Sequence, residues 1–110
     1  MTNFFSNFDV VLVKPEELLD PSSDIRAKPD GLGGYLLQLN SNSDYFQNIF
    51  GEQQVFTKHE RQQITLFAIG AFLKRNPEAR RKFLPELEDE SGVDVAIARL
   101  AEGAVERGEL

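Results

Sequence analysis

The stretch TKHERQQITLFAIGAFLKR, residues 57–75, has the start, the apolar pattern and the end of a long helix. The hydroxyl of Thr57 can accept a hydrogen bond from the amide of Glu60, whose carboxylate can accept one from the amide of Thr57; this is a capping box. Apolar residues then cover more than one helical face between positions 64 and 73. Since such helices are normally buried between neighbours, the pattern predicts a central helix over residues 58–75.

Two further helices are predicted after the central one. Pro77 disfavours helical geometry at Asn76, so the central helix ends there, and Asn76 can cap a second helix that begins with Pro77. After an acidic turn at 88–92, where Ser91 and Asp94 resemble a weaker capping pair, a last helix is expected. Its apolar face comprises Val93, Ala96, Ile97, Leu100, Ala101 and Ala104.

The region before the central helix is less regular. Pro15 is expected to begin a helix of one or two turns, and Ser43 to cap a helix over 44–50 that ends at Gly51. The sequence PSSDIRAKPDGLGG, residues 21–34, combines two prolines with three glycines and turn chemistry. It lacks the spacing of a phosphate-binding loop and is interpreted as a flexible connector.

The N-terminus is rich in large apolar side chains. Three valines within residues 10–13 favour a strand over 9–13, because β-branched side chains lose rotamers in a helix, although the spacing of Phe4, Phe8 and Leu12 would also suit a helical face. Residues 35–39 are the best partner for such a strand. The phenylalanines at 4, 5 and 8 have two interpretations: core of this chain, or an apolar arm that docks on a second subunit.

These elements together predict one mainly α domain. A small bundle of three to four helices is expected around the central helix 58–75, within a helical core that spans 35–110. Residues 1–34 are expected to form a partly extended N-terminal arm, or short β-ribbon, and a flexible connector. On this interpretation, deletion of residues 2–8 leaves the helical core folded.

Composition limits the function. The chain has 110 residues, no cysteine and a net charge of −6, which excludes disulfides and thiolate metal sites. An acidic chain is repelled by phosphate backbones and anionic lipid, so nucleic acid and membrane surfaces are not expected partners. No apolar run reaches the roughly 20 residues that span a bilayer, and the N-terminus does not resemble a signal peptide. A cytoplasmic location is expected.

Candidate sites are few. His59 is the only histidine, and its place in the first turn of the central helix suits a solvated residue better than a catalytic base. No catalytic, cofactor or metal site is predicted. The basic segment 74–82 stands out in an acidic chain, either as a charged face with weak ion pairs or as a binding patch for an acidic protein or a phosphate.

The favoured function is a non-enzymatic protein-interaction module, such as an adaptor, assembly factor or regulator. A homodimer through the arm or the central helix is also expected. One alternative is a nucleic-acid-associated protein that uses 74–82; another is an acidic inhibitor or immunity-type protein. No motif is specific enough to name a family. The candidate interaction residues are Phe4, Phe5, Phe8, Lys74, Arg75, Arg80, Arg81 and Lys82.

Overall fold

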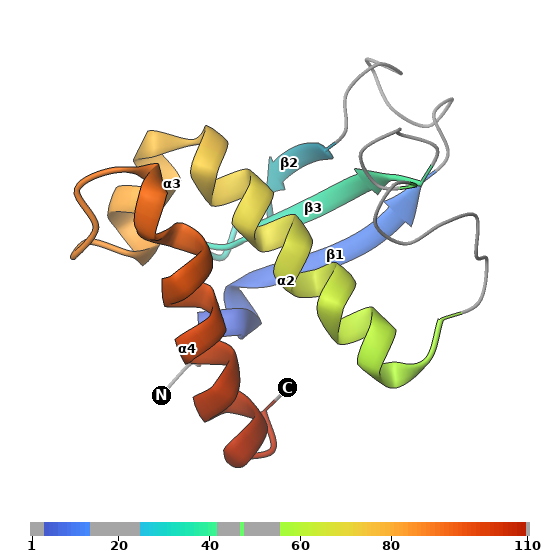
Figure 1. Ribbon diagram of the computed structural model, residues 1–110. Helices are drawn as coiled ribbons and strands as arrows, with labels where there is room; N and C mark the ends of the chain where they lie inside the picture. Colours follow the sequence, from blue (N-terminus) through green and yellow to red (C-terminus); the bar gives the residue numbers. More distant parts are fainter. Residues whose placement is uncertain (1–3, 14–24, 42–46, 48–55, 110) are drawn as a thin grey trace.

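The computed structural model describes residues 4–13, 25–41, 47 and 56–109 (Figure 1). In these ranges a three-stranded sheet comes first and the helices follow. The predicted helices at 15–20 and 44–50 lie outside the described residues, except for Gln47, which is helical. In chain order the elements are the 3-10 turn η1 (Phe4–Asn7), β1 (Phe8–Val13), β2 (Ile25–Pro29), β3 (Tyr35–Asn40), α2 (Lys58–Arg75), α3 (Pro77–Phe83), the 3-10 turn η3 (Glu90–Gly92) and α4 (Val93–Glu106).

The sheet has the strand order β1-β3-β2. β1 pairs in parallel with β3, from Phe8 beside Tyr35 to Val13 beside Asn40. β2 pairs antiparallel with β3, with Ile25 beside Leu39. The predicted pairing of residues 9–13 with 35–39 is thus confirmed. The mainly α class, the helical bundle and the extended arm are wrong: the chain is an α/β domain, and residues 4–13 belong to its sheet and core.

A β-hairpin replaces part of the expected flexible connector. One carboxylate oxygen of Asp30 accepts hydrogen bonds from the amides of Leu32 (2.7 Å) and Gly34 (2.9 Å), and the Asp30 amide donates to the Gly34 carbonyl (3.1 Å). Gly31 and Gly33 have φ angles of 81° and 91°, a region that favours glycine. The turn residues of this stretch therefore join β2 to β3.

Gly34 also brings this hairpin against the N-terminal turn. A Cβ atom at this position would lie 2.2 Å from the backbone oxygen of Asn7, so no larger residue fits without a shift of the backbone. The close approach of Gly34 fixes η1 and the start of β1 beside the hairpin.

The helix boundaries follow the local signals at two of three helix starts. At α2 the Thr57 hydroxyl accepts from the Glu60 amide (3.1 Å), and the Glu60 carboxylate accepts from the Thr57 amide (3.0 Å). Asn76 caps α3 through the amide of Ala79 (3.0 Å). The predicted Ser91 and Asp94 pair is wrong, because Gly92 is the cap of α4 and makes no side-chain hydrogen bond there.

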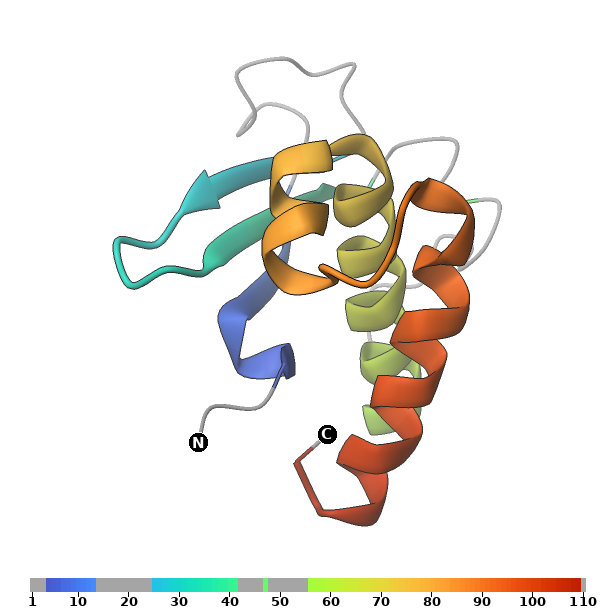
Figure 2. The same ribbon diagram turned by 90° about the vertical axis from the view of Figure 1, so that its left-hand side faces the viewer.

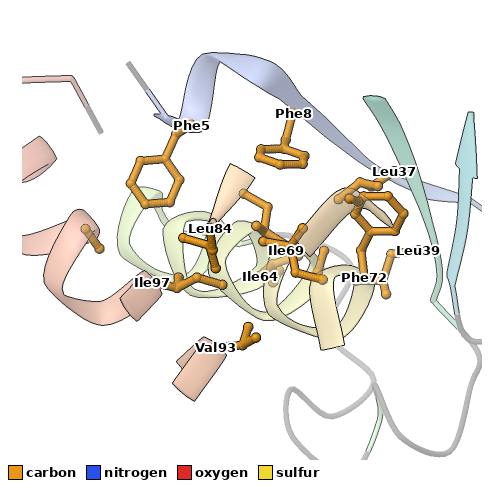
Figure 3. Packing of buried hydrophobic residues seen from close by; sticks show 14 of the residues in the cluster. Phe5, Phe8, Leu37, Leu39, Ile64, Ile69, Phe72, Leu84, Val93 and Ile97 are labelled. Atoms are coloured by element: carbon orange, nitrogen blue, oxygen red, sulfur yellow. The ribbon is translucent and has the colours of Figure 1, made fainter. Parts of the chain in front are cut away.

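The molecule has three layers. Figure 2 shows the sheet on one side of α2 and α4 on the other side. α2 is buried from both directions, as its apolar pattern predicts. Figure 3 shows the core between these layers, where rings from the N-terminus meet α2 and the helices after it. The buried cluster comprises Phe5, Phe8, Leu37, Leu39, Ile64, Ala68, Ile69, Phe72, Leu73, Ala79, Leu84, Val93, Ile97, Ala101 and Ala104.

Candidate functional site

Basic side chains of the segment 74–82 contact several different parts of the fold. The Nζ atom of Lys74 lies 3.0 Å from a carboxylate oxygen of Asp94 on α4. A guanidinium nitrogen of Arg80 donates to the carbonyls of Leu73 (3.0 Å) and Lys74 (3.1 Å). These carbonyls lie in the last turn of α2, where helix geometry leaves the acceptors without partners. Arg80 therefore satisfies the C-terminus of the central helix.

Lys82 joins α3 to the hairpin. Its Nζ atom donates to the carbonyl of Gly33 (2.6 Å) and lies 5.1 Å from the centre of the Phe83 ring. Arg75 also has an interaction within the chain. Arg81 is exposed and has no hydrogen bond or ion pair among the residues that the structure describes. The candidate cations thus lie near one another, but most of them hold elements of the fold together.

We predict a large difference between Arg80→Ala and Arg81→Ala. The first removes two charge-assisted hydrogen bonds from partly buried carbonyls and should lower the free energy of unfolding by about 1–3 kcal/mol. The second changes an exposed side chain and should stay within about 0.5 kcal/mol of the parent protein. Urea titrations followed by circular dichroism measure both values, and equal stability of the two variants would contradict the capping role of Arg80.

The N-terminal phenylalanines form an aromatic cluster inside the chain. Phe8 lies 4.9 Å from Phe83, measured between ring centres, and 6.4 Å from Phe72. Phe4 lies 5.0 Å from Phe5 and 6.5 Å from Phe83. Phe5 and Phe8 are buried, with 7% and 5% of their surface exposed. Phe4 is partly buried against the same core. Phe5 and Phe8 therefore need no partner to cover them, and the reason for treating these two rings as part of a docking arm is removed.

Sequence reasoning did not identify a groove that the described residues form between two helices. This α2–α4 groove lies between the first turns of α2 and the last turns of α4, which separate from each other in Figure 1. Its volume is about 730 Å³. The lining residues are His59, Gln62, Gln63, Leu66, Ala98, Ala101, Glu102, Val105 and Glu106.

The α2–α4 groove combines an apolar floor with acidic side chains on its α4 side. Leu66, Ala101 and Val105 supply apolar surface, and Val105 is 55% exposed. Glu102 and Glu106 are exposed along the α4 side. The one sequence feature that could have indicated this groove is Val105, an apolar residue that lies outside the apolar face of the last helix.

A smaller groove of about 450 Å³ lies on the other flank of α4. Leu87, Val95 and Leu100 contribute apolar surface to it, and Val95 is 55% exposed, like Val105. Glu86 and Arg99 carry opposite charges at this groove. The two grooves therefore differ in charge although both border the same helix.

The acidic turn before α4 has a structural role. The carboxylate of Asp89 accepts hydrogen bonds from the hydroxyl (2.5 Å) and the amide (2.9 Å) of Ser91, and these bonds lower the pKa of Asp89 below its ordinary value. Within the described ranges no three histidine, aspartate or glutamate side chains are grouped so that they could hold a metal ion.

The fold and the grooves define a small α/β domain with helices on one face of a mixed sheet. Comparison of the chain with family models, with curated proteins and with solved structures gave no match. No helix in the described part of the chain is both long and apolar enough to cross a bilayer.

Proposed function

We propose that this protein is a non-enzymatic protein-interaction module that binds a basic, amphipathic helix of a partner protein in the α2–α4 groove. The observation that carries this function is the apolar floor beside the acidic side chains of α4. Amphipathic helices bind such grooves through apolar anchors spaced by three or four residues. Glu102 and Glu106 favour a partner with lysine or arginine beside those anchors.

The geometry of α4 also supports this function. One face of α4 packs on α2 through Ile97, Ala101 and Ala104, which are buried. Val105 stands beside this face and remains largely exposed. A partner that covers Val105 and the neighbouring Leu66 would extend an existing apolar surface, and burial of apolar area contributes roughly 25 cal/mol per Å².

Phosphate binding through residues 74–82 has less support. Lys74, Arg80 and Lys82 contact groups of the same chain, and an incoming phosphate would compete with those contacts. Arg81 alone offers an exposed cation without a described partner. The net charge of −6 opposes nucleic acid at longer range as well.

Two designed peptides test the proposed function by fluorescence anisotropy. The first is a labelled helix with leucine at anchor positions and lysine elsewhere; the second has glutamate in place of lysine. We expect saturable binding of the lysine peptide and no binding of the glutamate peptide. Binding that survives at physiological salt indicates apolar contact in addition to charge attraction.

A matched pair of variants locates the binding. Val105→Lys and Val95→Lys each add one positive charge at a valine of α4 that is 55% exposed, but only Val105 lines the α2–α4 groove. We expect Val105→Lys to weaken binding of the lysine peptide about tenfold more than Val95→Lys, which is 1.4 kcal/mol. Equal effects of the two variants, or no binding by the parent protein, would contradict the proposed function.

A further inference from the structure

The two edges of the sheet differ in how they are protected against pairing. β2, at one edge, contains Arg26, Lys28 and Pro29. Charged side chains and proline are common means by which proteins prevent an edge strand from pairing with another chain. β1, at the other edge, has the sequence FDVVLV with Asp9 as its single charge. The edge at β1 therefore lacks the protection that the edge at β2 has.

The side chains of β1 also leave apolar surface exposed. Val11 is 40% exposed and Leu12 is 38% exposed. Val10 packs against the buried core beneath the helices, so Val11 lies on the opposite face of the sheet. Val11 and Leu12 thus leave apolar surface open on one face each, although Val13, on the same face as Val11, is buried.

The backbone of β1 also presents hydrogen-bonding groups along the outer edge of the sheet. The amide of Ser41 donates to the carbonyl of Val13 (3.1 Å), so the backbone of Val13 points toward β3. The backbone amide and carbonyl groups of successive residues point alternately to the two sides of a strand. Those of Val11 therefore also point toward β3, while those of Val10 and Leu12 point away from β3, outward from the edge of the sheet. No hydrogen bond to these outward groups is found within the described ranges.

We propose that β1 pairs antiparallel with β1 of a second copy of this chain, around a two-fold axis that passes beside Val11. The two sheets then form one continuous six-stranded sheet. Val10 of each copy lies opposite Leu12 of the other, and these two residues exchange both backbone hydrogen bonds. Val11 lies opposite Val11 of the second copy in the closer, non-hydrogen-bonded position.

The strand is complementary to itself in this register. Asp9 lies opposite Val13 of the second copy, so the two aspartates do not face each other across the axis. The outward groups of Val10 and Leu12 find partners of the correct spacing in an identical strand. An isologous contact of this kind closes into a dimer and leaves no further β1 edge open.

The dimer is independent of the proposed function. The α2–α4 groove contains no residue of β1, and Figure 2 shows the sheet and α4 on opposite sides of α2. Loss of the dimer should leave peptide binding unchanged, and loss of peptide binding should leave the dimer unchanged. Each can therefore fail without the other.

The central test uses Val11→Lys and Val11→Glu, measured by sedimentation velocity at physiological ionic strength. The parent protein should form a dimer as its concentration rises toward about 1 mM, the range in which weak association becomes visible. Either variant alone should be monomeric, because two like charges would face each other at the axis. An equimolar mixture of the two should recover a dimer, since lysine then faces glutamate.

Two controls separate this pairing from other causes. Val105→Lys, an exposed change of the same kind on α4, should leave the dimer intact. Hydrogen exchange on the parent protein should show protection of the Val10 and Leu12 amides that increases with protein concentration, which requires no variant to fold. A parent protein that stays monomeric, a dimer that Val11→Lys does not weaken, a mixture that stays monomeric, or edge amides that exchange fast at every concentration would each overturn the proposal.

Discussion

Removal of residues 2–8 should unfold the whole domain. The deletion takes Phe5 and Phe8 from the core, where 7% and 5% of their surface is exposed, and it removes the first residue of β1. Truncation of one buried phenylalanine costs about 3–5 kcal/mol. Two such losses approach the total of roughly 5–15 kcal/mol that stabilises a domain. This result is the opposite of what an independent N-terminal arm would give.

Far-UV circular dichroism and thermal melting measure the effect of the deletion. We expect a strong loss of helical signal and no cooperative transition. The double variant Phe5→Leu with Phe8→Leu is the control, because it keeps large apolar side chains at both positions and should retain a cooperative melt. A truncated protein that keeps its helical signal and melting temperature would restore the interpretation of these residues as an arm.

The starts of α2 and α3 were predictable because their signals are local, whereas the capping pair predicted for α4 did not form. Thr57 and Glu60 are three residues apart, and their reciprocal hydrogen bonds need only the geometry of the first helical turn. The same holds for Asn76 and Pro77 at the start of α3. These patterns depend on backbone geometry within one turn, which the sequence specifies directly.

The sheet was only partly predictable because its pairing is not local. The valines of β1 indicated a strand. In β2, Ile25 and Ala27 do alternate with Arg26 and Lys28, but the stretch is short, and alanine, lysine and proline are depleted in strands. β2 forms because the turn at Asp30 places it beside β3. In this position Ile25 and Ala27 of β2 pack against the core. Prolines and glycines that suggested a connector therefore mark a hairpin instead.

In the candidate site, too, local features were predictable from the sequence and contacts between distant residues were not. The sequence displayed the basic segment 74–82 but not the partners of its cations. Asp94 is 20 residues from Lys74, and Gly33 is 49 residues from Lys82. The α2–α4 groove depends on how two helices diverge, and no spacing within either helix encodes that divergence.

The contribution of the central helix is tested best at Phe72, which joins it to the sheet. Phe72 is 5% exposed, and its ring centre lies 4.9 Å from that of Tyr35 on β3 and 6.4 Å from that of Phe8 on β1. Phe67 is on the same helix but is only partly buried. The apolar pattern of residues 64–73 does not by itself distinguish the two rings, whereas the structure predicts unequal effects.

Phe72→Ala should lower the free energy of unfolding by about 3–5 kcal/mol, because it leaves a cavity between helix and sheet. The melting temperature should fall by more than about 10 °C in a domain of this size. Phe67→Ala should cost only about 1–2 kcal/mol, since part of its ring is already in water. Calorimetry and urea titration of both variants provide the comparison, and an equal loss in the two, or an unchanged melt for Phe72→Ala, would mean that α2 does not pack on the sheet as described.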